Sequence, residues 1–197
     1  MSDLYISPWM QALLLPKRWD ICGIEVKPLS IWHLFILEQL KNPYVCGGIP
    51  DKDAISTLIL YTERDFKEGT RIFKNHVYRE KVLKQIYKRI KPIEWESLHN
   101  ACLDFVKACT RVPDHKYPED SKSKSLAAPY QFHLIGVLCP MMNLSLDATW
   151  NLPYAEAKCY YDAAAERGGD DTLCNLKSQI GVDKYIEDEM RAKEKNK

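Results

Sequence analysis

Apolar positions alternate with polar ones near the start of the chain. Trp19, Ile21, Ile24 and Val26 favour extended structure, and Gly23 interrupts them. We therefore expect a small β-hairpin over residues 17–29. A two-stranded ribbon is only marginally stable alone, so it should lie on an apolar surface.

The next stretch, residues 31–40, is apolar on most sides, which is typical of a buried helix. Ser30 precedes it and offers an N-cap. The helix should end before Pro43, because proline disfavours helical geometry in the residue that precedes it. A loop, Cys46-Gly-Gly-Ile-Pro50, should follow.

Helical spacing of apolar residues continues through most of the chain. A helix over 54–61 has Asp51 or Asp53 as its cap, and the sequence does not choose between them. The further helical segments are a basic stretch 64–91, then 94–110, 130–142, 145–150, 153–167 and a last amphipathic run 173–190. The helix 94–110 aligns Leu98, Cys102, Phe105 and Cys109 on one face. In the helical segment 130–142, Pro140 is the point at which we expect a break.

Residues 150–169 contain a complete helix signature. Pro153 suits the first turn of a helix, where its missing N–H would be unpaired anyway. Alanines fill the interior, and Gly168 and Gly169 suit the turn that closes a helix. Nothing in the segment is chemically reactive, so it indicates helical packing.

Proline, serine and alternating charges make 112–129 the clearest linker or surface loop. It divides residues 1–111, a hairpin plus a helical region, from the C-terminal helical region 130–197, whose tail 191–197 should fray. The predicted fold class is all-α, mainly a helical bundle, with a small N-terminal β-hairpin.

Composition limits the function classes. The chain has 197 residues, of which 46% are hydrophobic, so it can fill a core. Its net charge of +1 gives no global attraction to nucleic acid or to an anionic membrane. Because no run approaches the roughly 18 apolar residues that cross a bilayer, and the N-terminus lacks a signal pattern, we expect a cytoplasmic protein without a membrane partner.

The seven cysteines are odd in number and contain no Cys-x-x-Cys pair. A disulfide framework or a zinc module would show a different pattern, so we expect reduced, mostly buried thiols. His99 and Cys102 are three residues apart on one helix face, but a structural zinc site needs about four ligands. We expect packing there, and no metal or cofactor.

The five histidines stand in no recognisable catalytic setting. His33 and His133 lie inside apolar helices and should be satisfied residues of the core or its boundary. The carboxylates at 187–189 indicate a solvated helix face, and the Cys46-Gly-Gly loop lacks the lysine of a phosphate-binding loop. We therefore expect no enzymatic activity.

The basic stretch is the one functional signal in the composition. Residues 64–91 hold ten basic and three acidic residues, a net charge of +7, with Tyr78 and Tyr87 among the lysines. Such interleaving also occurs on nucleic-acid-binding faces. Residues 147–197 carry eleven acidic and eight basic residues, a net of −3, so a solvated helix or a protein partner is favoured over nucleic acid.

Two segments resemble one family. The first runs from Pro16 to Tyr44, with a short hairpin and then a Pro-Leu-Ser…His-Leu…Leu-Glu helix that ends in Pro-Tyr. The second is Trp150-xx-Pro-xxx-Ala-xx-Tyr-xx-Ala-Ala-Ala-Glu-xx-Gly169. Together they cover about a quarter of the chain and are similar to tail assembly chaperone-like proteins of tailed phages and prophages.

The resemblance implies a mostly helical, non-enzymatic protein that holds tail-tube subunits or the tape-measure protein until the tube is built. Homo-oligomerisation is compatible with it. A holding chaperone needs an exposed apolar or amphipathic face, with basic groups to bind an acidic partner segment. Our candidate partner-binding residues are Tyr160, Tyr161, Leu173, Leu176, Ile180, Ile186, Arg79, Lys84 and Lys88.

Two alternatives remain at this point. The first alternative is a structural virion component of the tail or neck. The second is a nucleic-acid-binding regulator that uses residues 64–91. Absence from purified virions would separate a chaperone from a virion component, and steeply salt-dependent DNA binding would favour the regulator.

Overall fold

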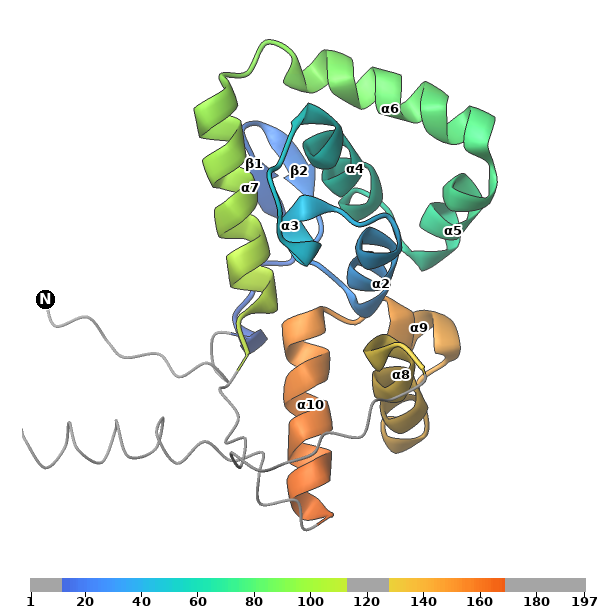
Figure 1. The fold of residues 1–197 in the computed structure, drawn as a ribbon. Helices are drawn as coiled ribbons and strands as arrows, with labels where there is room; N and C mark the ends of the chain where they lie inside the picture. Colours follow the sequence, from blue (N-terminus) through green and yellow to red (C-terminus); the bar gives the residue numbers. More distant parts are fainter. Residues whose placement is uncertain (1–11, 113–127, 169–197) are drawn as a thin grey trace, which may run out of the picture.

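A computed structural model describes residues 12–112 and 128–168 (Figure 1). Within those residues the chain is mainly helical with one antiparallel two-stranded hairpin, which confirms the predicted fold class. The elements are β1 (Trp19–Ile21), β2 (Ile24–Val26), α2 (Ile31–Gln39), α3 (Pro43–Cys46), α4 (Lys52–Thr62), α5 (Phe66–Lys74), α6 (His76–Ile90), α7 (Trp95–Thr110), α8 (Tyr130–Met141), α9 (Leu146–Trp150) and α10 (Tyr154–Arg167).

The predicted hairpin is confirmed. Its strands pair Trp19 with Val26 and Ile21 with Ile24 across a two-residue turn. Both turn residues have positive φ, 51° at Cys22 and 84° in the glycine that follows, as a type I′ turn requires. Trp19 packs edge-on against Phe105 of α7 at a centroid distance of 5.9 Å, so the ribbon does lie on an apolar surface.

Helix α2 begins as predicted and α3 was missed. The Ser30 side chain accepts a hydrogen bond of 3.2 Å from the backbone N–H of His33 and so caps α2. The chain does turn at Pro43, but this proline also starts α3. Asn42 is the N-cap of α3, because its side-chain oxygen accepts a hydrogen bond from the N–H of Tyr44 at 3.1 Å.

Side-chain hydrogen bonds at helix N-termini identify the cap of α4 and divide the basic stretch. Asp51, rather than Asp53, accepts from the N–H of Ala54 at 2.7 Å. Asn75 ends α5 and caps α6, accepting from the N–H of Tyr78 at 3.0 Å. The stretch 64–91 therefore holds two helices, which sequence spacing alone had merged into one helical region.

The core contains the predicted face of α7, since Leu98, Cys102, Phe105 and Cys109 are all fully buried. The expected break at Pro140 does not occur. This proline lies in the last turn of α8, and the helix ends one residue later. The proline has no N–H to donate to the carbonyl of Gly136 four residues earlier, and the helix continues for only one residue after it.

An aromatic cluster joins the early and late helices. Its five rings come from α2, α5, α8 and α9, with neighbouring ring centroids 5.2 to 6.2 Å apart. The members are Trp32, Phe35, Phe66, Phe132 and Trp150. One continuous hydrophobic core thus includes residues that precede and residues that follow 113–127, the segment that the structure does not describe.

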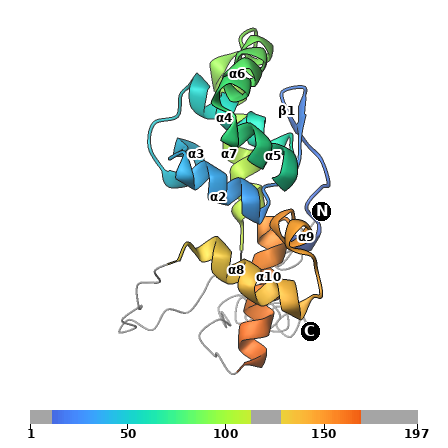
Figure 2. The ribbon, with the colours of Figure 1, turned by 90° about the vertical axis from the view of Figure 1, so that its right-hand side faces the viewer.

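Figures 1 and 2 show α6 across one end of the molecule, above α4, with α8, α9 and α10 towards the other end. Backbone hydrogen bonds link the hairpin–α2 connection to the start of α10. The N–H of Ile31 donates to the carbonyl of Leu152 at 3.1 Å, and the N–H of Tyr154 donates to the carbonyl of Leu29 at 2.7 Å. We call these contacts the Leu29–Tyr154 junction.

Some expectations lie outside the described residues. They are nearly all of the 112–129 linker, the amphipathic run 173–190 and the tail 191–197. Among the helices that the structure does describe, none combines the length and the apolar character that a bilayer crossing needs.

Burial of the cysteines differs in part from the prediction. Cys102, Cys109 and Cys159 are buried, but Cys22 and Cys46 are exposed and Cys139 is half-buried. Cys22 lies at the hairpin turn and Cys46 ends a one-turn helix, so neither position faces the core. All six are free thiols.

Candidate functional site

Helix α6 presents a basic outer face. Val82, Ile86 and Ile90 are buried at a spacing of four residues, so the opposite side of the helix faces solvent. Lys81 and Lys84 are exposed on that side, and so is Val77, which is 79% exposed. The structure thus places the basic signal of the sequence on the surface.

Several other basic groups of this region form ion pairs with carboxylates of the same chain. Arg89 reaches Glu63 at 2.6 Å, Arg64 reaches the same carboxylate at 3.3 Å, and Lys67 reaches Asp147 at 3.2 Å. The Arg89 pair links α6 to the end of α4, and the Lys67 pair links α5 to α9. The lysines on the outer face of α6 make no such pair within the described residues.

Two arginines of this region contact aromatic rings. The guanidinium of Arg71 lies 5.8 Å from the ring centre of Tyr78. That of Arg79 lies 6.0 Å from the ring centre of Phe73. Such cation–π contacts hold the arginine side chains in place but do not neutralise their positive charge.

The exposed lysines of α6 behave differently. Across residues 12–112 and 128–168, none of Lys81, Lys84, Lys88 and Lys91 takes part in an ion pair. Spacings of three and four residues put them on one side of the helix. We call these four residues the lysine stripe.

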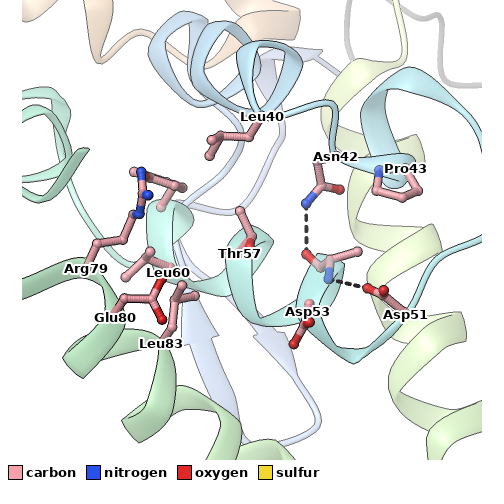
Figure 3. A pocket seen from close by; sticks show the side chains of 12 residues that line it. Leu40, Asn42, Pro43, Asp51, Asp53, Thr57, Leu60, Arg79, Glu80 and Leu83 are labelled. Carbon is pink, nitrogen blue, oxygen red and sulfur yellow. Dashed lines mark hydrogen bonds between the residues drawn. The ribbon is translucent and has the colours of Figure 1, made fainter. Parts of the chain in front are cut away.

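A hollow of about 320 Å³ lies beside this helix (Figure 3). Arg79, Glu80 and Leu83 reach it from α6, and Asp51 and Asp53 lie across from them at the start of α4. The apolar part of the wall comes from Leu40, Leu60 and Leu83.

Two further hollows continue the first. One of about 290 Å³ shares Asp53, Thr57, Glu80 and Leu83 with it and extends to Lys84. The other, an open depression of about 600 Å³ on the outer side of α6, shares Glu80 and Lys84 with the second. The three hollows share lining residues in turn, from Leu40 at the end of α2 to the lysine stripe, and we call them together the α4–α6 groove.

One wall of the groove is held rigidly by Asn42, which is buried. Its side-chain amide donates to the carbonyl of Ala54 at 2.8 Å while its oxygen caps α3 (Figure 3). The groove therefore runs from an end fixed at α3–α4 to a lysine-bearing end on α6. Its lysines and apolar wall are complementary to an extended chain with acidic and apolar side chains.

Side chains considered for metal or acid–base chemistry are engaged in packing. His99 stacks on Trp95 at 5.6 Å, and its Nδ1 hydrogen-bonds the hydroxyl of Tyr44 at 2.8 Å. Burial raises the pKa of the Cys102 thiol to about 12, so it is protonated at neutral pH. The described residues include no group of three or more His, Cys, Asp and Glu side chains that could hold a metal ion.

The two helix-embedded histidines differ. His33 is buried and hydrogen-bonded through both ring nitrogens, as expected. His133 is half-buried, and its buried Nε2 has no hydrogen-bond partner among the described residues, so the expectation that it is satisfied is wrong. Helical spacing located both residues but carried no information about their partners.

The predicted partner-binding residues divide into separate places. Arg79, Lys84 and Lys88 line the groove and its outer depression. Tyr160 and Tyr161 lie on α10, away from α6 (Figure 1), and are half-buried against the core. Leu173, Leu176, Ile180 and Ile186 lie outside the described residues.

Packing within the chain already occupies the α10 tyrosines. Tyr161 meets Tyr130 of α8 edge-on at a centroid distance of 6.0 Å, and Lys158 lies 5.8 Å from the centre of the Tyr161 ring. Burial raises the pKa of Tyr160. The groove is therefore the stronger candidate for a partner.

Sequence reasoning missed the α4 side of the groove. Asp53 was considered only as a helix cap, and Thr57 and Leu83 lay within predicted helical segments without any assigned role. No local signal joins them to the lysines, because the approach of α4 to α6 depends on the packing of the whole core.

Comparisons of the chain with protein-family models, with curated proteins and with solved structures find no match.

Proposed function

We propose that this protein is a tail assembly chaperone of a tailed phage or prophage, and that it acts by binding rather than by catalysis. It would hold tail-tube or tape-measure protein in the host cytoplasm until assembly. The observation that carries the proposal is the Leu29–Tyr154 junction, which connects the two segments that resemble this family.

The junction matters because helical packing patterns are common. Residues 16–44 and 150–169 are far apart in sequence, and either pattern alone has modest specificity. In the folded chain their backbones meet, and Ser30 and Pro153 form an isolated antiparallel bridge. The resemblance therefore concerns one structural unit, which supports the proposal more than two independent matches would.

The groove provides what a holding protein needs. It combines exposed apolar surface at Val77 with lysines that make no ion pair in the described part of the chain. Binding through surfaces of mixed polarity favours fast, reversible association. A chaperone has to release its partner when the tube grows.

The direct test is co-expression of the tagged chain with the tail-tube and tape-measure proteins encoded in the same gene cluster. We expect one of them to co-purify and to be more soluble than when expressed alone. Purified virions, analysed by mass spectrometry, should lack the chain. Stoichiometric presence in virions would favour a structural component instead, and failure to bind any tail protein would reject the role.

A further inference from the structure

We propose that the α4–α6 groove binds an acidic segment of the partner that also carries a bulky apolar side chain. The inference rests on the proposed function for the identity of the partner, but the chemistry of the segment follows from the groove itself. Carboxylates would lie along the lysine stripe, and the apolar side chain would enter the hollow beside Leu83.

Charge is the first argument. Lys81, Lys84 and Lys88 line the open depression, where the acidic side chain is Glu80. Of the arginines near α6, Arg89 contacts the carboxylate of Glu63, whereas Arg71 and Arg79 lie over aromatic rings. Because the lysine stripe makes no ion pair within the described residues, a ligand with spaced carboxylates complements it.

Apolar surface is the second argument. Val77 is 79% exposed directly beside the lysines, and Tyr87 is 40% exposed along the same groove. Leu40, Leu60 and Leu83 line the deeper hollow. A purely acidic chain would leave this apolar surface in water, whereas a segment with a leucine or phenylalanine would bury it.

The carboxylates in the groove argue against nucleic acid as the ligand. Asp51 and Asp53 line the hollow across from Arg79, and Glu80 lies beside that arginine on α6. These three carboxylates would repel a regularly spaced phosphate backbone. A peptide can place its acidic side chains at the lysine stripe and its apolar side chain at the hollow. The groove therefore favours a peptide over nucleic acid.

The test begins with the full chain and a displayed library of random twelve-residue peptides. We expect the enriched peptides to combine Asp or Glu with Leu, Ile or Phe. The affinity of one labelled peptide is then measured by fluorescence anisotropy. Replacing its acids by Asn and Gln, or its apolar residues by Ser, should each weaken binding at least tenfold, and 0.5 M NaCl should weaken it by a similar factor.

Variants of the protein locate the site. Lys84→Glu with Lys88→Glu should weaken peptide binding at least tenfold, and Thr57→Leu, which fills the hollow without changing charge, should weaken it several-fold. The matched control is Lys17→Glu with Lys107→Glu, two exposed lysines that do not line the groove, which should bind within twofold of the unaltered chain. Circular dichroism verifies that each variant is folded.

Three results would overturn the inference: peptides enriched without acidic residues, no enrichment at all, or a twenty-nucleotide DNA that binds more tightly and displaces the peptide. Tail-protein capture that survives Lys84→Glu with Lys88→Glu would also reject the groove while leaving the chaperone role intact. Conversely, acidic-peptide binding by a chain that captures no tail protein would support the groove and reject the chaperone role.

Discussion

The backbone carbonyl of Arg64 accepts a hydrogen bond of 2.8 Å from Nε2 of His33, which ties α2 to the loop before α5. The other ring nitrogen, Nδ1, accepts from the backbone N–H of Ser30 at 3.0 Å. This arrangement needs a neutral ring with its proton on Nε2. Burial lowers the pKa of His33 to about 4.

The first prediction is loss of stability in mild acid. The unfolded chain takes up a proton at its ordinary histidine pKa of about 6.5, before folded His33 does. The stabilisation by neutral His33 is therefore complete above about pH 6.5 and declines as pH falls towards 4, by about 3 kcal/mol in total. Urea unfolding at pH 7.5, 6, 5 and 4 measures this decline in the free energy of unfolding.

Carboxylates also titrate in that range, so a variant isolates the histidine. His33→Gln keeps one acceptor and one donor but does not titrate. Its unfolding free energy should be lower at pH 7.5 and should depend less on pH between 6.5 and 4. Parallel pH profiles for both proteins would contradict the assignment.

The second prediction concerns the contact between Gly69 and Trp32. A Cβ added at Gly69 would lie 2.7 Å from Nε1 of the buried Trp32 ring, which is too close. Gly69→Ala should therefore separate α5 from α2 and cost about 1–3 kcal/mol of unfolding free energy. Chemical denaturation monitored by tryptophan fluorescence measures this loss.

Helix α8 offers a matched control for Gly69→Ala. A Cβ at Gly136 would have no neighbouring atom within 4 Å, and the residue is helical and exposed. Gly136→Ala should therefore stabilise the protein by about 0.5–1 kcal/mol. Equal effects of the two substitutions would argue against the close approach of α5 to Trp32.

A third prediction concerns Asn42, whose side chain bonds both the N–H of Tyr44 and the carbonyl of Ala54. Asn42→Ala removes both bonds inside the protein and should cost about 2–4 kcal/mol. Asn75→Ala removes one cap bond at an exposed position and should cost only about 1 kcal/mol. A smaller loss for Asn42→Ala than for Asn75→Ala would contradict this account.

The fourth prediction concerns thiol reactivity. Cys22 is exposed, whereas burial raises the pKa of Cys109 and of Cys159 to about 11. Iodoacetamide at pH 7.5 should therefore alkylate Cys22 within minutes and leave Cys102, Cys109 and Cys159 intact until urea unfolds the chain. Peptide mapping by mass spectrometry identifies the modified residues, and rapid labelling of Cys102 in the folded protein would contradict the described core.

Short-range signals made most of the fold predictable from sequence. Caps such as Ser30 and Ser145 act on residues three positions later, and the buried face of α7 repeats every three or four residues. The hairpin turn at Gly23 is equally local. These features depend on backbone geometry within one helical turn or one β-turn, so neighbouring residues are sufficient to specify them.

Some local signals were ambiguous until the chain was folded. Pro43 ends one helix and begins another, Asn75 divides the basic stretch, and Pro140 fits inside the last turn of α8. At each of these residues, the local sequence is compatible with two backbone continuations. Packing against the core selects between them.

The chain alone thus determines most of its helices, its hairpin and the position of its basic stretch, because these follow from interactions among near neighbours. Only the tertiary structure decides that Leu29 meets Tyr154, and that Thr57 lies across a groove from Lys84. Such contacts depend on how helices cross over a shared core. That geometry results from the sum of many weak packing contacts, which no short motif encodes.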